Sequence, residues 1–195
     1  VDKVGVYGSK GVAAASNKPR IRLDAATWVS DDGRLWLMGG NYTDTVINGR
    51  VYTNYFNDLW SYNPQTGYWT WQGGDSIPNQ GGILGVKGIA SVDNKPGAFS
   101  NAHYWTGTDG RFWLMRGNEL WNYDSKTTYW TWQGGDTIPN QVGIFGTLGV
   151  EDSANKPRAV QDALTWTGPD GRLWFMGGFY TESVLFPGEI WPRTV

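Results

Sequence analysis

The sequence lacks cysteine altogether, and it contains a single histidine, His103, in 195 residues. Without cysteine, the chain cannot form disulfides, thiolate metal sites or a cysteine nucleophile. One histidine does not make a multi-histidine metal centre, and no motif places it in a Ser-His-Asp triad. We therefore expect a protein without cofactor, metal or enzymatic activity.

The sequence also lacks a large excess of charge of either sign, and it lacks long apolar runs. Sixteen basic residues face 18 acidic ones, and no basic block provides the electrostatic footprint of a nucleic-acid-binding protein. No run of about 18 apolar residues is present, so no membrane span is expected. The composition therefore argues against nucleic acid as a partner and against a membrane-spanning segment.

Tryptophan and glycine, in contrast, are abundant, with 13 and 28 residues. A chain rich in glycine and aromatic residues, and poor in helix-favouring runs, is typical of an all-β fold with many tight turns. The length suits one ordinary domain with a core of its own.

The sequence repeats itself three times. Its most regular motif stands as "GRLWLMGG" at 33–40, "GRFWLMRG" at 110–117 and "GRLWFMGG" at 171–178. An Asn-Lys-Pro motif precedes each copy, and "NDLW", "NELW" or "GEIW" follows it. The first copy has a 16-residue insert between Gly40 and Asn57, the second has none, and the third has nine residues. We define three units within one domain, 1–195, with approximate bounds 19–72, 96–133 and 157–195.

Each unit predicts four short antiparallel strands. An Asp-Gly pair joins the first two strands, which is a strong hairpin signal. The second strand, "RLWLM" in the first unit, is apolar on both faces and is predicted to be covered on both sides. The third strands are "DLWSY" and "ELWNY", and the fourth are "YWTW". The third unit starts its third strand at 188–191 but lacks "YWTW", and Pro192 does not suit a ladder.

The order "PR…W…DGRLW.MGG…NDLW.Y.P.T..W.W" closely resembles the kelch repeat, including its bacterial forms similar to the galactose oxidase central domain. The Gly-Gly pair of that family stands at Gly39-Gly40 and Gly177-Gly178, and it is broken to Arg116-Gly117 in the second unit. The resemblance implies a β-propeller of four-stranded blades and an exported or cell-surface protein. Copper-radical oxidase chemistry does not carry over, because it needs two histidines and a tyrosine joined to a cysteine.

Three blades, one without its outer strand, are fewer than the four to eight that close a propeller. We therefore expect the ring to be completed from outside these residues. The partner is either the chain itself, with two copies giving six blades, or the rest of a longer chain.

One face of such a disc carries the long loops, and variable loops on a fixed scaffold are where partners bind. We expect contacts with a protein or glycan from the aromatic residues of these loops and from two acidic residues of the inter-unit linkers. The candidates are Tyr42, Tyr52, Tyr55, Phe56, Phe179, Tyr180, Phe186, Asp75 and Asp136. The open alternatives are that the first insert pairs with itself and only covers the ring or a seam, and that the two linker aspartates cap turns or bind calcium.

All the tryptophans follow the repeat, and none lies in a variable loop. Face-to-face sheets need large side chains to fill the space between them, so we predict a structural role for the whole set. The set comprises Trp28, Trp36, Trp60, Trp69, Trp71, Trp105, Trp113, Trp121, Trp130, Trp132, Trp166, Trp174 and Trp191. A sugar-binding platform at Trp69 and Trp71 is the alternative.

Single polar positions of the repeat favour scaffold roles as well. His103 stands where the other units have Ala26 and Leu164, so we predict that it is a core or edge histidine. Asp32, Asp109 and Asp170 are predicted hairpin-turn residues rather than paired catalytic carboxylates.

The leading hypothesis is a non-enzymatic interaction and assembly module that binds protein through the long-loop face and associates with itself. A carbohydrate-binding propeller is the alternative, and an enzyme with its active site on the long-loop face comes third.

Overall fold

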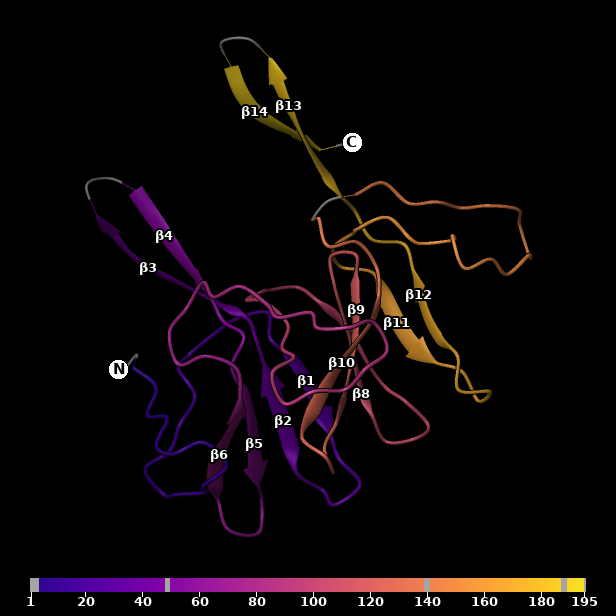
Figure 1. The fold of residues 1–195 in the computed structure, drawn as a ribbon. Helices are drawn as coiled ribbons and strands as arrows, with labels where there is room; N and C mark the ends of the chain where they lie inside the picture. The colour runs from indigo at the N-terminus through magenta and orange to yellow at the C-terminus, as the bar shows by residue number, and fades with distance from the viewer. Residues whose placement is uncertain (1–3, 48–49, 139–140, 187–188, 195) are drawn as a thin grey trace.

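The computed structural model describes residues 4–47, 50–138, 141–186 and 189–194. All its regular elements are β-strands, which pair antiparallel throughout (Figure 1). No helix suited to crossing a membrane occurs among these residues. The expectation of an all-β fold is therefore confirmed.

The first two units each form a four-stranded sheet. In the first sheet the order is β1-β2-β5-β6, and in the second it is β7-β8-β9-β10. These eight strands are the predicted ones, and their apolar, aromatic-rich sequences suit a sheet that is covered on both faces. Their bounds are Ala26–Val29, Leu35–Met38, Leu59–Asn63, Tyr68–Gly73, His103–Thr106, Phe112–Arg116, Glu119–Asp124 and Tyr129–Gly134.

The third unit forms a sheet of only two strands, β11 (Leu164–Thr167) and β12 (Leu173–Met176). The predicted third strand lies in β14 (Glu189–Thr194), which pairs with β13 (Thr181–Phe186) and not with β12. The expectation that this segment extends the third sheet is therefore wrong. A hairpin with the preceding residues closes only a short loop, so it costs less chain entropy than a longer-range pairing.

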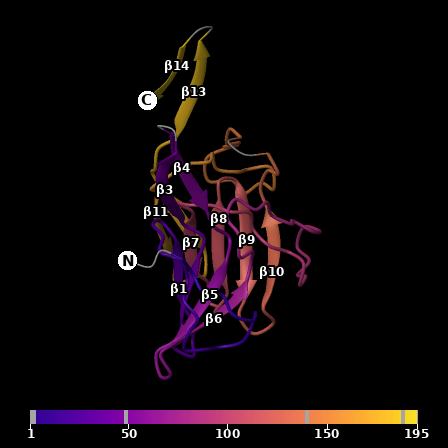
Figure 2. The same ribbon diagram turned by 90° about the vertical axis from the view of Figure 1, so that its left-hand side faces the viewer.

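The insert of the first unit also pairs with itself. Strands β3 (Asn41–Ile47) and β4 (Arg50–Tyr55) follow β2 in the chain and form a separate hairpin, after which β5 pairs with β2. One of the alternatives stated above predicted this self-pairing. Figures 1 and 2 show this hairpin and β13–β14 projecting from the same end of the sheets.

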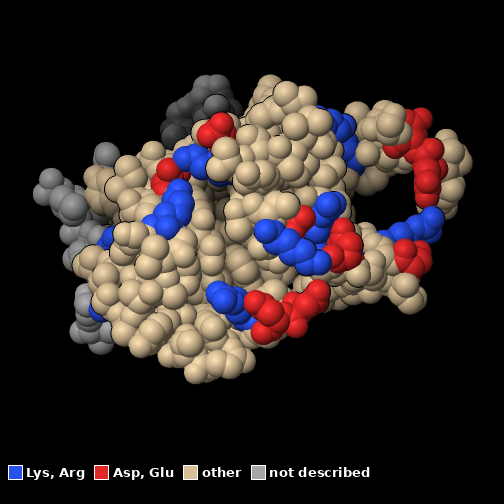
Figure 3. Space-filling view, turned by 60° about the horizontal axis from the view of Figure 1, so that its bottom comes forward, with Lys and Arg blue, Asp and Glu red and all other residues tan. Residues whose placement is uncertain are grey.

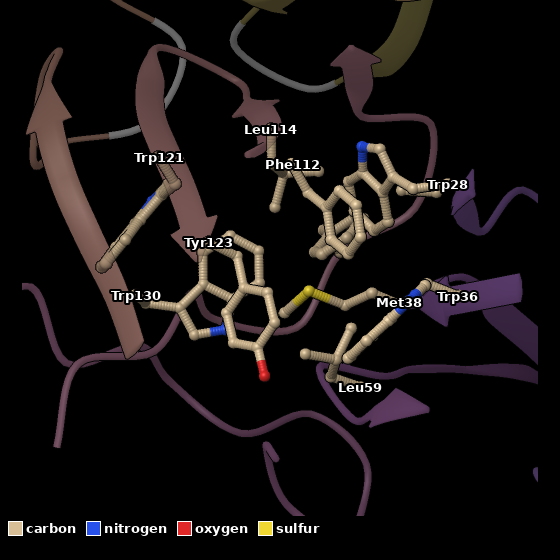
Figure 4. Close-up of a cluster of buried hydrophobic side chains, with 11 residues drawn as sticks. Trp28, Trp36, Met38, Leu59, Phe112, Leu114, Trp121, Tyr123 and Trp130 are labelled. Carbon is tan, nitrogen blue, oxygen red and sulfur yellow. The ribbon is translucent and has the colours of Figure 1, made fainter. Parts of the chain in front are cut away.

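The two four-stranded sheets pack face to face through their aromatic side chains. Trp28 of β1 stacks on Phe112 of β8 with ring centroids 5.4 Å apart, and Trp36 meets the same ring edge-on at 5.2 Å. Figure 4 shows these rings together with the buried Leu114 and Tyr123. This seam is the main core of the molecule, since aromatic side chains bury the largest apolar area per residue.

Hydrogen bonds from indole nitrogens cross the seams. Trp28 Nε1 donates to the main-chain oxygen of Trp105 at 3.0 Å, and Trp105 Nε1 donates to that of Trp174 at 2.8 Å. Tryptophan is suited to this place because it combines a large apolar body with one donor. The repetition of tryptophan in the first strand therefore has a structural cause.

The linkers that precede the first and second units run along the outer strands of those units. Ala14 bridges to Trp69 of β6, and Ser91 bridges to Trp130 of β10. The asparagine of the Asn-Lys-Pro motif holds each linker there, because Asn17 Nδ2 donates to Trp69 O and Asn94 Nδ2 to Trp130 O. The linkers thus cover the edge of each complete sheet.

Candidate functional site

The end of the sheets with the short turns carries mixed charges. Asp32 pairs with Arg34 at 3.0 Å, and Asp109 lies 3.7 Å from Arg111. The aspartates also accept main-chain N–H groups two residues later, as in Asp170 with Arg172 at 3.2 Å. Figure 3 shows acidic and basic side chains side by side at this end. These residues stabilise hairpin turns, as predicted. Their positive and negative charges alternate, so they do not create an electrostatic potential of a single sign.

The aromatic candidates at the opposite, long-loop end differ in exposure. Tyr52 and Tyr55 of β4 are exposed, whereas Tyr42 of β3 is half-buried beneath the guanidinium of Arg20, 5.1 Å from the ring centre. Phe56 is only 2% exposed and bridges to Phe99. Phe56 therefore belongs to the core, where no partner can reach it.

The candidates of the third unit also differ in exposure. Phe179 is exposed and bridges to Gln161 through the main chain. Tyr180 is half-buried, and the guanidinium of Arg158 lies over its ring at 3.3 Å. Phe186 falls outside the residues whose side chains the structure describes, and so does Trp191.

The two linker aspartates each pair with a lysine. Lys95 Nζ lies 2.7 Å from Asp75 Oδ1, and Lys156 Nζ lies 2.5 Å from Asp136 Oδ1. Burial by itself would raise the pKa of Asp75, but hydrogen bonds from Lys95 and Asn57 outweigh it and lower the pKa. Within the described part of the chain, no three acidic or histidine side chains come together as a metal site would require. Each aspartate anchors its linker.

A pocket of about 580 Å³ opens at the long-loop end, between the units. It brings together two of the predicted contact residues, Tyr55 and Asp136, and three residues not predicted, Arg116, Asn118 and Gln161. One signal was available for Arg116, since it replaces the first glycine of the Gly-Gly pair in the second unit only. Asn118 gave no such sequence signal, because the first unit has the same residue type, Asn57, at the matching position.

The outer face of the third unit exposes the side chains that the inner seams bury. Trp166 and Trp174 lie parallel, 5.9 Å apart at 4°, and each is 45% exposed. Their counterparts in the first unit, Trp28 and Trp36, are only 4% and 5% exposed. Met176 beside them is 60% exposed. This outer face (Leu164, Trp166, Trp174 and Met176) is apolar and uncovered.

On the opposite face of the first unit, the part over β1 and β2 is uncovered as well, whereas Tyr7 packs on Trp60 over β5. Leu35 is 45% exposed, whereas its counterpart in the second unit, Phe112, is fully buried against the first sheet. The two outermost units therefore expose different apolar surfaces, and the counterparts of these side chains are buried at the seam between the first two units.

Of the two outer-strand tryptophans of the first unit, Trp71 is covered by the linker that precedes this unit, and Trp69 packs on Tyr62 of β5. Tyr7 meets Trp71 edge-on at 5.3 Å, and Lys10 Nζ lies over the same indole at 4.8 Å. Trp71 Nε1 donates to Gly73 O, and Trp69 is half-buried. Lys10 and Tyr7 thus occupy the surroundings of the Trp71 indole that a sugar platform would need.

His103 lies at the seam between the second and third units. Its Nε2 is 3.0 Å from Val160 O, and its ring stacks on Phe175 at 5.8 Å. Burial lowers the pKa of His103, which favours the neutral ring. His103 is therefore a buried scaffold residue, as predicted.

A comparison with protein-family models matches none of them, and a comparison with curated proteins gives no significant relative.

Proposed function

We propose that the chain is a non-enzymatic interaction and assembly module, a kelch-like β-propeller segment that associates head to tail with further copies of itself. The supporting observation is the contrast between Trp166 and Trp174, half-exposed on the outer face, and their buried counterparts Trp28 and Trp36. The propeller assignment is supported by the three repeats and by four-stranded sheets that pack face to face.

The inner seam between the first two units indicates how the outer faces fit. On one side of it lie the two tryptophans, and on the other side lies Phe112. In an assembly, Trp166 and Trp174 of one copy take the place of these tryptophans, and Leu35 of the next copy takes the place of Phe112. Contact between two different faces generates rings if the rotation closes and filaments if it does not.

The long-loop end is the second contact surface in this proposal. The β3–β4 hairpin presents the exposed Tyr52 and Tyr55 there, and aromatic residues on projecting loops favour protein contacts. An exported or cell-surface location is part of the proposal and rests on the kelch resemblance.

Sedimentation velocity over a range of concentrations tests the head-to-tail contact. We expect the native chain to associate, and we expect Leu35→Glu or Trp174→Glu to weaken the association, since a charge cannot be buried unpaired at a seam. Both positions are about half-exposed in the single chain, so circular dichroism should show an unchanged fold.

A mixture of the two variants gives the sharper result. Each variant keeps the one good face that the other lacks, so the mixture should form heterodimers and nothing larger. A native chain that stays monomeric at high concentration, or variants that associate like the native chain, would overturn the proposal.

A further inference from the structure

The linker that precedes the third unit has the same internal hydrogen bonds as the linkers that precede the first two. Asn17, Asn94 and Asn155 each donate through Nδ2 to the main-chain oxygen five residues earlier, at 2.9, 2.9 and 3.0 Å. A main-chain bridge closes each linker as well. The bridges are Val6–Lys18, Ile83–Lys95 and Ile144–Lys156. The third linker therefore has the shape that the other two use to cover an outer strand.

The first two linkers use further donors to hold that strand. Gly11 N donates to the main-chain oxygen of Trp71 in β6 at 2.8 Å, and Asn17 Nδ2 donates to the same strand at 3.1 Å. The second linker binds β10 in the same way. In the third linker the matching donors are Gly149 N and Asn155 Nδ2, and neither reaches a strand of the described part of the chain. The donors for an outer strand are thus present, and no described strand uses them.

The exposure of one aromatic side chain agrees with this difference. Phe145 of the third linker is 79% exposed. Its counterparts Tyr7 and Leu84 are half-buried, and Tyr7 contacts Trp60 and Trp71 with ring centroids 5.0 and 5.3 Å apart. Phe145 therefore occupies the position that packs on the third and fourth strands in the first unit.

A neighbouring position of the same linker shows no such difference. Val150 is 56% exposed, and its counterparts Val12 and Ile89 are 55% and 58% exposed although strands lie against their linkers. The third linker as a whole is therefore no more exposed than the others at positions that do not contact a strand. The exposure of Phe145 is specific to the contact with a strand.

Strand β12 provides the other side of the same site. In the complete units the second strand pairs with a third, β2 with β5 and β8 with β9, and the fourth strand then lies against the linker. Among the described strands, β12 pairs with β11 and with no other. Figure 1 shows the third linker, in orange, standing away from β11 and β12. We call β12 together with the linker 142–155 the open edge, and two strands separate the matching segments in the other units.

We propose that the open edge binds a β-hairpin of a partner protein, of the kind that β5 and β6 form. The first strand of the hairpin pairs with β12, and main-chain oxygens of the second accept from Gly149 N and Asn155 Nδ2. An indole of the second strand packs on Phe145, and Leu148, which is fully exposed, adds apolar contact. Main-chain bonds give such strand addition its affinity, and the side-chain contacts give it specificity.

The hairpin comes from another molecule, because the linkers of the first two units already hold β6 and β10. The inference rests on the repeat architecture of the proposed function, and it adds a contact of a different kind. Head-to-tail association uses the side chains of the sheet faces, whereas the open edge uses main-chain groups of β12 and the linker.

Fluorescence anisotropy with a labelled synthetic hairpin tests the site on the whole chain. The probe is the sequence of residues 57–73, "NDLWSYNPQTGYWTWQG". We expect saturable binding of one hairpin per chain. Phe145→Ser should weaken the binding about tenfold, because it removes an aromatic contact. Val150→Ser is the matched control on the same linker and should leave binding unchanged. Both side chains are exposed, so circular dichroism should show an unchanged fold.

Two further variants separate this site from the head-to-tail contact. Leu35→Glu should bind the hairpin like the native chain although it no longer associates, and Phe145→Ser should associate like the native chain in sedimentation velocity. A probe that carries Trp71→Ser should bind about tenfold more weakly than the native probe. The proposal is overturned if the hairpin does not bind, if Phe145→Ser binds it as tightly as Val150→Ser, or if Leu35→Glu abolishes the binding.

Discussion

The indole nitrogen of Trp28 donates a hydrogen bond to the main-chain oxygen of Trp105, which stands at the same place one unit later, 77 residues along the chain. Trp105 Nε1 in turn donates to the third unit, to the main-chain oxygen of Trp174 in the second strand of that unit. The repeat thus carries its own connection between sheets. Trp166 is the next indole in this series, and it lies half-exposed on the outer face.

Replacing Trp28 with phenylalanine should lower the free energy of unfolding by about 1–3 kcal/mol. The change leaves a buried carbonyl oxygen without its donor and reduces the packing on Phe112. Urea unfolding followed by circular dichroism measures the loss. Trp166→Phe is the matched control and should cost less than about 0.5 kcal/mol in the monomer, because that indole is not enclosed. Equal losses for the two variants would contradict the role of the seam.

Replacing Gly39 with alanine should destabilise the fold more than the same change at Gly177. Both glycines have positive φ, 68° and 77°, so both variants pay the cost of a left-handed conformation, about 1 kcal/mol. At Gly39 the added Cβ would also lie 2.4 Å from the ring of Phe99, whereas at Gly177 it meets nothing within 4 Å. Thermal unfolding of the two variants compares them. A similar midpoint for both would show that the ring moves aside without cost.

Removing the carboxylate of Asp58 should cost about 3–5 kcal/mol, the usual effect of breaking a buried ion pair. Arg22 Nη2 donates to Asp58 Oδ2 at 2.8 Å, and the same oxygen accepts from Tyr7 and from Trp60 Nε1. Asp58→Ala leaves these donors unpaired, and the guanidinium is only 3% exposed. Denaturant unfolding gives the loss, and Asp32→Ala in an exposed turn should stay below about 1 kcal/mol. A small effect at Asp58 would mean that water reaches these donors.

His103 should make the fold less stable as pH falls. Burial lowers its pKa in the folded chain, so below pH of about 6.5 the unfolded chain takes up the proton more readily than the folded one. Stability is then lost at no more than about 1.4 kcal/mol per pH unit, and the loss levels off below the folded pKa. Urea midpoints between neutral and mildly acidic pH measure the slope. His103→Leu, which copies Leu164 of the third unit, should flatten it, and an unchanged slope would assign the pH dependence to other groups.

The all-β fold, the eight strands of the two complete sheets and the role of the turn aspartates followed from the sequence, because they depend on local patterns. Short segments contain all of these signals: strand and turn residues in alternation, Asp-Gly pairs, and tryptophans that recur at matching positions. The repeat also identified the long loops as the variable part of the molecule, and it placed Asp75 and Asp136 at matching positions of the linkers.

The pairing of β14 and the different hydrogen-bond partners of Asn57 and Asn118 were decided only in three dimensions. Glu189–Thr194 carries a third-strand motif, yet it pairs with the hairpin partner nearest in the chain. Asn57 and Asn118 stand in matching local sequences, yet Asn57 Nδ2 donates to Asp75 Oδ2, whereas Asn118 Nδ2 donates to the main-chain oxygens of Gln141 and Pro157. Local sequence specifies strands and turns. The choice between competing strand pairings, and the hydrogen-bond partners of a buried side chain, depend on segments that lie far apart in the chain.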